Sequence, residues 1–227
     1  VYVKFRLSDD AVGALFAAPG VVGAMAPDVP IYIVAWTTTP WTLPGNTALA
    51  VQPEAEYSVL EHEGELLIVA SALRQVAPED ATTATTLRGS DLVGLHYDPL
   101  YVPAGWGVQA MWFDRAQNSR LVPAESVGHI ENAYVILAGD FVSLEDGTGV
   151  VHTAVMYGED DYKLGEAVGL PKVHTVNEDG TFNDLVAQWK GWPVKHKDKP
   201  TEEKTTTAII EDLKNRGLLL KEEKYTH

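Results

Sequence analysis

Short runs of strand-forming residues, each closed within a few positions by proline or glycine, most constrain the fold of this chain. The runs lie at residues 1–7, 31–36, 47–51, 57–60, 66–70, 133–138 and 150–156. We predict that residues 57–60 and 66–70 form a hairpin around the turn at residues 61–64. Helix signals are fewer: a start near Ser8, residues 159–168, and residues 201–216 between a Thr201 cap and Gly217. Many short strands with few helices are typical of barrels. We therefore predict a mainly β fold, with a closed β-barrel core and peripheral α-helices.

Some stretches lack this regularity. Residues 77–86 are polar and threonine-rich, which indicates a surface excursion, and residues 98–128 carry scattered aromatic residues without periodicity. Residues 37–46 contain two prolines, which we expect to exclude both a central strand and a helix. We interpret residues 1–227 as a single domain with an irregular insert at residues 72–130.

Composition excludes several classes of protein. The chain has 227 residues and no cysteine, which excludes a disulfide scaffold, a thiolate zinc site and a cysteine nucleophile. No apolar run approaches the roughly 20 residues that span a bilayer, and no signal-peptide pattern opens the sequence. The 17 basic and 32 acidic residues give a formal net charge of −15. Because neutralising phosphates supplies most of the affinity for nucleic acid, this charge argues against a free-standing nucleic-acid binder.

Common catalytic motifs do not occur in the sequence. The seven histidines form no His-x-x-x-His pair, and there is no Gly-x-Ser-x-Gly elbow and no glycine-rich loop ending in Gly-Lys-Ser/Thr. Residues 146–149 read Asp-Gly-Thr-Gly, which is the wrong order for an aspartic protease. Histidines on the surface or in structural positions are the simplest interpretation.

Residues 37–46, Thr-Thr-Thr-Pro-Trp-Thr-Leu-Pro-Gly-Asn, form the first segment that suggests a site. In an extended chain, Thr37 and Thr39 point to one side and Thr38 to the other. Two prolines fix the backbone, so these hydroxyls would lose little entropy on binding a ligand. The alternative is that threonine serves as a strand former and Pro-Trp plugs the end of a barrel.

Two further segments follow later in the chain. His152 stands on an apolar strand directly after the glycine-rich turn at residues 145–149, where it is either a pocket wall, an acid or base, or a satisfied core histidine. Residues 158–161, Gly-Glu-Asp-Asp, place carboxylates at the start of a helix, either to bind a cation such as an ammonium or as ordinary first-turn acids.

These three segments, in this order, resemble the editing domain of isoleucyl-tRNA synthetase, the connective peptide 1 insertion of a class I enzyme. Residues 37–46 resemble its threonine-rich peptide, and residues 147–152 with 158–161 resemble its second peptide. The two ends, residues 1–5 and 221–227, resemble the entrance and exit of the insertion, so we expect a domain of a larger enzyme. The valyl- and leucyl-type editing domains carry Arg where Thr39 stands here.

The resemblance implies a β-barrel editing domain that hydrolyses the ester of mischarged valyl-tRNA(Ile) with a positioned water and spares isoleucyl-tRNA(Ile). A hydrophobic pocket separates side chains that differ by one methylene only weakly, and isoleucine against valine is the standard example. The resemblance implies no cofactor and no metal. The expected partners are the 3′ CCA end of tRNA(Ile) carrying valine and the remaining domains of the synthetase, in the cytoplasm and without a membrane.

The resemblance also implies roles for individual residues. Asp161 matches the aspartate that binds the α-ammonium of the aminoacyl group. Because Glu159 and Asp160 stand directly beside it, the alignment of the three acids with the family motif is left open. Thr39 and His152 form the pocket walls that refuse isoleucine. Trp41 packs beside these walls. The catalytic residues, which hold the ester, the ribose or the water, are Thr37, Thr38 and Asn46. His152 as general base is the alternative mechanism.

Other functions remain open at this point. The domain could dock the CCA end without hydrolysis, could edit for a valyl or leucyl sister enzyme, or could act as a free-standing editing protein. It could also be an unrelated β-barrel binding module, but then the occurrence of the three segments in this order would be a coincidence.

Overall fold

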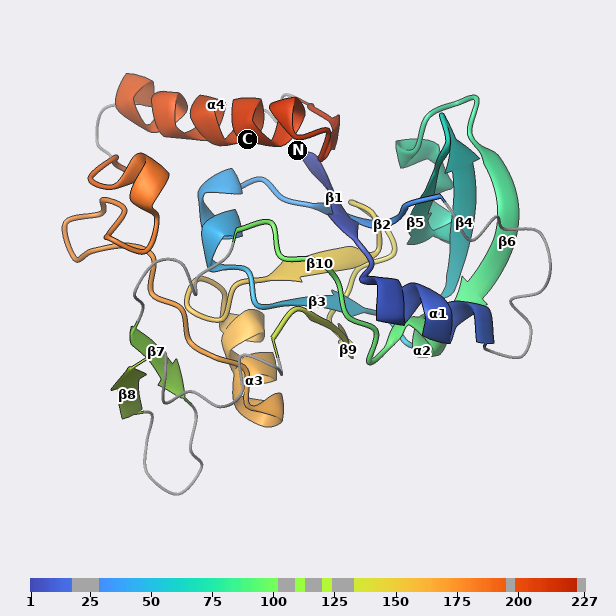
Figure 1. Cartoon of the computed structure of the whole chain (residues 1–227), viewed down its shortest axis with the longest axis horizontal. Helices are drawn as coiled ribbons and strands as arrows, with labels where there is room; N and C mark the ends of the chain where they lie inside the picture. The colour runs from blue at the N-terminus through green and yellow to red at the C-terminus, as the bar shows by residue number, and fades with distance from the viewer. Residues whose placement is uncertain (18–28, 102–108, 113–119, 124–132, 195–198, 224–227) are drawn as a thin grey trace.

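The computed structural model describes residues 1–17, 29–101, 109–112, 120–123, 133–194 and 199–223 (Figure 1). Within these residues one large sheet has the strand order β6–β4–β5–β2–β10–β3–β9, with β1 beside β2 and β11 beside β1. Its strands are β1 Tyr2–Arg6, β2 Ile31–Trp36, β3 Ala48–Val51, β4 Glu56–His62, β5 Glu65–Ala70, β6 Thr82–Arg88, β9 Val135–Ala138, β10 Val150–Thr153 and β11 Leu219–Lys221. A separate hairpin pairs β7 Gln109–Trp112 with β8 Arg120–Pro123.

Helices lie around the sheet, with α4 along one side of it and α3 towards the opposite side in the view of Figure 1. The helices are α1 Asp9–Ala17, α2 Gly89–Leu92, α3 Glu159–Val168 and α4 Lys199–Asn215, and the 3₁₀ turns are η1 Pro40–Gly45, η2 Ser71–Val76 and η6 Ala187–Trp189. Leu15 of α1 and Ile209 and Leu213 of α4 join Phe5 and Ile33 in the main hydrophobic core. The prediction of a mainly β fold with peripheral helices is confirmed.

The prediction of a closed barrel is wrong, because the sheet is open. The strands at the two ends of its order, β6 and β9, pair with β4 and β3 and not with each other. Closure depends on how far strands tilt and shift against one another. Short strands and turn signals describe neighbouring residues only, so they fit an open curled sheet as well as a barrel.

The sheet divides at β2. This strand pairs antiparallel with β1 along its length, parallel with β5 over residues 31–33, and parallel with β10 at Trp36. In Figure 1 the half formed by β4, β5 and β6 runs across the direction of β3 and β10. The end of β2 therefore leaves β5 and comes to lie beside β10, which brings residues 37–39 next to His152.

Local patterns predicted most strands well, with one clear error. β2 has the predicted bounds, and β4 and β5 form the predicted hairpin, turning at Glu63 and Gly64 with φ of 47° and 80°. The predicted surface excursion at residues 77–86 is wrong from Thr82 onward, because β6 pairs antiparallel with β4. β6 is an edge strand with mostly exposed side chains, so it shows no apolar alternation. Residues 102–108, 113–119 and 124–130 of the expected insert lie outside the described residues.

Gly149, at the glycine turn before β10, cannot accept a side chain. Its φ is 72°, and a Cβ at this position would overlap the Cβ of Ala70 on β5. We expect Gly149→Ala to lower the free energy of unfolding by about 2–4 kcal/mol, measured by urea denaturation. Gly13→Ala in α1 is the control, since an added Cβ there meets no atom within 4 Å and a helix favours alanine. Equal losses in both variants would contradict this account.

Candidate functional site

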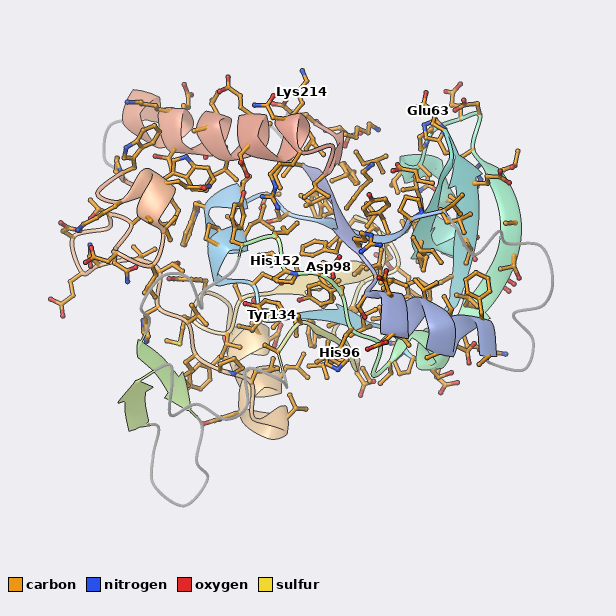
Figure 2. The ribbon with its side chains drawn as sticks, in the orientation of Figure 1. Glu63, His96, Asp98, Tyr134, His152 and Lys214 are labelled. Carbon is orange, nitrogen blue, oxygen red and sulfur yellow. The ribbon has the colours of Figure 1, made fainter. Side chains whose placement is uncertain are left out.

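A cavity of about 270 Å³ opens where β2 ends, between the chain that follows β2 and the chain that follows β10. Three stretches of the sequence line it. The lining residues are Trp36, Thr37, Thr38, Thr39 and Thr42 from the end of β2 and η1, Val151, His152 and Ala154 from β10 and its end, and Tyr157 and Asp161 from the start of α3. The three segments singled out in the sequence thus meet at one cavity, and His152 lies in the interior of the fold (Figure 2).

The three consecutive threonines have different surroundings. Thr37 is buried, whereas Thr38 and Thr39 are exposed at the cavity. The backbone N–H of Thr39 donates to Thr37 Oγ1 at 3.1 Å, and the Oγ1 atoms of these two residues lie 3.4 Å apart. Thr37 and Thr39 therefore face the same side, as the extended pattern predicted, although the strand has already ended.

The segment after the threonines forms the 3₁₀ turn η1, so the expectation that its prolines exclude a helix is wrong. Pro40 stands at the start of the turn, where a backbone N–H would have no helical partner anyway. The N–H of Thr42 donates to the carbonyl of Thr39 at 3.0 Å, and the N–H of Asn46 donates to the carbonyl of Leu43 at 3.0 Å. The turn fixes Thr42 at the cavity and Asn46 behind it.

Asn46 determines which nitrogen of His152 accepts a hydrogen bond. The hydroxyl of Tyr97 donates to Asn46 Oδ1 at 2.6 Å, while Asn46 Nδ2 donates to the carbonyl of Ala48 at 2.9 Å. The amide nitrogen therefore faces His152 and lies 3.1 Å from its Nδ1. Because an amide NH₂ group only donates, Nδ1 accepts this bond and carries no proton.

The other ring nitrogen of His152 is bound just as firmly. Nε2 lies 2.8 Å from Thr42 Oγ1, and the hydroxyl of Thr42 gives its own proton to the carbonyl of Thr39 at 2.9 Å. Thr42 must therefore accept from an Nε2–H. Burial also lowers the pKa of His152 to about 4. The imidazole is neutral with both nitrogens engaged, so it has no free lone pair with which to take a proton from water.

Asp161 presents a carboxylate to the cavity from the first turn of α3. Its Oδ2 accepts a hydrogen bond from the N–H of Ala154 at 3.1 Å, and it makes no ion pair with any residue that the structure describes. Burial raises the pKa of Asp161 to about 6, and the neighbouring charge of Asp160 adds to this shift. A partly desolvated carboxylate with no cationic partner among the described residues is a candidate position for a positively charged ligand.

The three adjacent acids are now distinguished by geometry. Glu159 and Asp160 lie 2.7 Å and 3.8 Å from the ammonium of Lys163 on the exposed side of α3. Of the three acids, only Asp161 lines the cavity. Of the three acids whose alignment the sequence left open, Asp161 is therefore the one that lies at the cavity.

The partly buried carboxylate of Asp161 should cost stability at neutral pH. Its pKa is about 6 in the folded chain against an ordinary 3.8, so between these pH values the folded state keeps a proton that the unfolded state has released. The free energy of unfolding therefore falls as pH rises through this window and stays lower above pH 6. The full effect is at most about 3 kcal/mol.

We expect Asp161→Asn to be more stable than the parent chain at pH 7.5 and nearly equal to it at pH 3.5. The amide oxygen of asparagine can still accept the N–H of Ala154. Urea denaturation at the two pH values measures the difference. Asp160→Asn, at an exposed position, is the matched control and should change stability by less than about 0.5 kcal/mol. A variant that is less stable than the parent at pH 7.5 contradicts the expectation.

Two of the predicted site residues stand behind the cavity and do not line it. Asn46 is buried and contacts His152 from the side away from the cavity. The ring of Trp41 packs edge to face on that of Tyr157, with centroids 5.1 Å apart. Trp41 thus contacts a residue of the cavity lining, Tyr157, whereas Asn46 contacts the lining residue His152.

Tyr157 was not predicted from the sequence. It stands in the chain between residues 147–152 and 158–161, and its side chain lines the cavity. Its hydroxyl accepts the N–H of Thr175 at 2.8 Å and lies 2.7 Å from Thr175 Oγ1. Gly45 permits this packing, since a Cβ there would lie 3.1 Å from the ring. An aromatic residue immediately before Gly158 was the available signal. Tyr97 was missed too, and no motif marks it.

Neither a metal centre nor a membrane-spanning helix is found in the described part of the chain. No three His, Cys, Asp or Glu side chains gather there in a group that could hold a metal ion. None of the described helices combines the length and apolar character needed to cross a bilayer.

Comparisons with known proteins identify relatives for nearly the whole chain, although no protein-family model matches it. Isoleucine–tRNA ligase of Clostridium tetani is 38% identical over 200 residues, which make up 86% of this chain and 16% of that protein. The enzyme of the same name from Dehalococcoides mccartyi is 36% identical over 228 residues, 100% of this chain and 21% of that protein. The one from Methanothermobacter marburgensis is 34% identical over 228 residues, 100% of this chain and 17% of that protein. This chain spans about a fifth or less of the length of these curated relatives.

Similar solved structures include a domain named GlLeuRS-CP1, with a TM-score of 0.49 and 17% identity, covering 72% of this chain and 57% of that one. The editing domain of the cytosolic leucyl-tRNA synthetase of P. knowlesi has a TM-score of 0.48 and 12% identity, covering 71% of this chain and 60% of that one.

Proposed function

Because this chain is homologous over 86–100% of its length to a segment of isoleucine–tRNA ligases, we propose that it is an editing domain that hydrolyses mischarged valyl-tRNA(Ile). The observation that carries the proposal is the unpaired carboxylate of Asp161 in a cavity whose histidine is neutral. Every aminoacyl ester carries an α-ammonium, and an ammonium against a carboxylate forms a strong, charge-assisted hydrogen bond.

In this proposal the side chain of the amino acid lies between Thr39 and His152. Both residues line the cavity, and both are held in place, Thr39 through its N–H to Thr37 and His152 through two ring hydrogen bonds. A rigid wall refuses the larger isoleucine by steric overlap, which discriminates more sharply than a missing contact does. Valine, one methylene shorter, fits.

The reaction needs only a positioned water. The oxygen of water bonds to the ester carbonyl carbon and the bond from that carbon to the ribose oxygen breaks. One proton of the water passes to the ribose oxygen, which leaves as a hydroxyl, and the other is released to solvent when the valine formed ionises to its carboxylate. Thr37 and Thr38 hold the ester, the ribose or the water through their hydroxyls, with Asn46 acting from behind His152. No protein base is assigned, because positioning alone contributes strongly to the hydrolysis of an already reactive ester. The occupied ring nitrogens of His152 support this choice.

The acidic charge fits a domain that grips only the end of the tRNA. With a formal net charge of −15, the chain should bind tRNA weakly and in a salt-sensitive way on its own. The partners in this proposal are the 3′ CCA end of tRNA(Ile) carrying valine and the remaining domains of a cytoplasmic synthetase, which hold the tRNA body.

Deacylation of purified tRNA(Ile) charged with radiolabelled valine or isoleucine tests the proposal. We expect the 227-residue chain at low salt to release valine much faster than isoleucine. Release of neither amino acid above the rate without protein contradicts the proposal. Binding of the charged tRNA without release would instead support a domain that only docks the CCA end.

A further inference from the structure

Tyr97 brings a hydroxyl to the back of the site from a segment outside all the matched motifs. The residue is 2% exposed and follows α2. Its ring packs edge to face against those of Phe5 and Tyr134, with centroid distances of 5.4 Å and 6.0 Å. Packing on two sides fixes the ring, so the position of its hydroxyl is fixed too.

This hydroxyl fixes the oxygen end of the Asn46 amide, while the carbonyls of Ala48 and Thr153 accept from its Nδ2 at 2.9 Å and 3.3 Å. It donates at 2.6 Å to Asn46 Oδ1, and no other described residue donates a hydrogen bond to that oxygen. Asn46 is 4% exposed, so water does not readily replace a lost partner. The bond keeps Oδ1 turned towards Tyr97 and Nδ2 turned towards His152.

We infer that Tyr97 is a positioning residue of this pocket, which acts through Asn46 to hold His152 neutral and protonated on Nε2. The wall beside the bound amino acid then carries no charge, and Asp161 stays the anionic partner of the ligand. The hydrogen-bond chain rests on geometry alone, whereas its effect on substrate choice rests on the proposed function.

Loss of the Tyr97 hydroxyl has a defined consequence. Asn46 Oδ1 is left buried without a donor, which is energetically costly and favours rotation of the amide. After rotation, Nδ2 no longer donates to Nδ1 of His152. The ring can then carry its proton on either nitrogen or on both. A histidinium in the cavity would compete with the α-ammonium of the substrate for Asp161.

Nitrogen NMR of the histidine rings in the full 227-residue chain tests the chain of contacts directly. The parent, Tyr97→Phe and Tyr134→Phe are compared between pH 5 and 8, and a His152→Gln variant assigns the signals. Tyr134→Phe is the matched control, because it removes a hydroxyl from the ring beside Tyr97 that makes no hydrogen bond to His152 or Asn46.

We expect His152 in the parent and in Tyr134→Phe to carry its proton on Nε2 throughout this range. In Tyr97→Phe we expect a mixture of the two neutral forms and titration above pH 5. A parent His152 protonated on Nδ1, or one that titrates near its ordinary pKa, overturns the inference whether or not any variant folds. An unchanged spectrum in folded Tyr97→Phe overturns it as well.

Deacylation of the same proteins separates this inference from the proposed function. We expect Tyr97→Phe to lower the preference for valyl- over isoleucyl-tRNA(Ile) by about 3- to 10-fold, and Tyr134→Phe to leave it unchanged. If the parent hydrolyses neither ester but Tyr97→Phe alters the His152 spectrum, the function fails and the positioning role stands. If the parent hydrolyses valyl-tRNA(Ile) and Tyr97→Phe matches it in spectrum and preference, the function stands and the inference fails.

Discussion

Asp161→Ala is expected to lower kcat/KM for the hydrolysis of valyl-tRNA(Ile) by about 100-fold or more. The α-ammonium of the substrate would lose the carboxylate that the proposal places opposite it, and no other acid among the residues that the structure describes lines that cavity. The surrounding fold should survive, since the carboxylate accepts one backbone hydrogen bond and is otherwise a cost to stability.

Asp160→Ala is the matched control for this loss. It removes a carboxylate from the same helical turn, but that carboxylate lies on the exposed side near Lys163. Single-turnover deacylation at a range of protein concentrations gives kcat/KM for both variants. Near-parental hydrolysis by folded Asp161→Ala would remove Asp161 from the proposed role.

The pKa of Asp161 also sets a pH dependence. Burial raises this pKa to about 6, so below pH 6 the free domain loses the negative charge that the proposal assigns to binding the ammonium. We expect kcat/KM of the parent to fall about tenfold per pH unit in this range. A folded Asp161→Asn variant should show a low, flat profile over the same range.

Thr39→Ala is expected to make the domain hydrolyse isoleucyl-tRNA(Ile), about 10- to 100-fold faster than the parent does. Room for one additional methylene is worth about 1–3 kcal/mol in such a pocket. The substitution removes the 3.4 Å contact between the Oγ1 atoms of Thr39 and Thr37. Alanine retains the backbone N–H that donates to Thr37 Oγ1 and the carbonyl that accepts from Thr42.

The parallel measurement of both esters decides this expectation. Thr83→Ala on β6 is the control, since it removes an exposed threonine that does not line the cavity. His152→Ala should also admit isoleucine, but it removes one hydrogen-bond partner from each of Thr42 and Asn46, so its stability must be measured alongside. If isoleucine stays protected in both folded variants, the wall roles are wrong.

The sequence predicts those features that depend on residues close together in the chain. β2 was predicted from a short run of strand-forming residues and the β4–β5 hairpin from the turn residues between its strands, and both have the form predicted. The convergence of the three motif segments on one cavity followed only from the family resemblance. Openness of the sheet depends on strands far apart in the chain, and residues 1–227 carry no local mark of it.

The supporting residues of the site escaped prediction for the same reason. Asn46 and Tyr97 are 51 positions apart, and the hydroxyl of Tyr97 matters only because packing aims it at one amide oxygen. Likewise, Trp36 and Val151 meet through the single parallel pairing of β2 with β10. Such residues look like ordinary core aromatic or apolar positions until the fold places them.

The neutral wall and the charged anchor of the cavity come from different parts of the chain and use different physics. In the proposed function, the anchor on α3 would recognise what every amino acid has in common, and the wall formed by Thr39 and His152 would recognise what distinguishes one amino acid from another. Ester cleavage would then be separable from the choice of amino acid. Changes confined to residues 39 and 152 could redirect the same hydrolysis to a different error of charging, with the anchor at Asp161 left as it is.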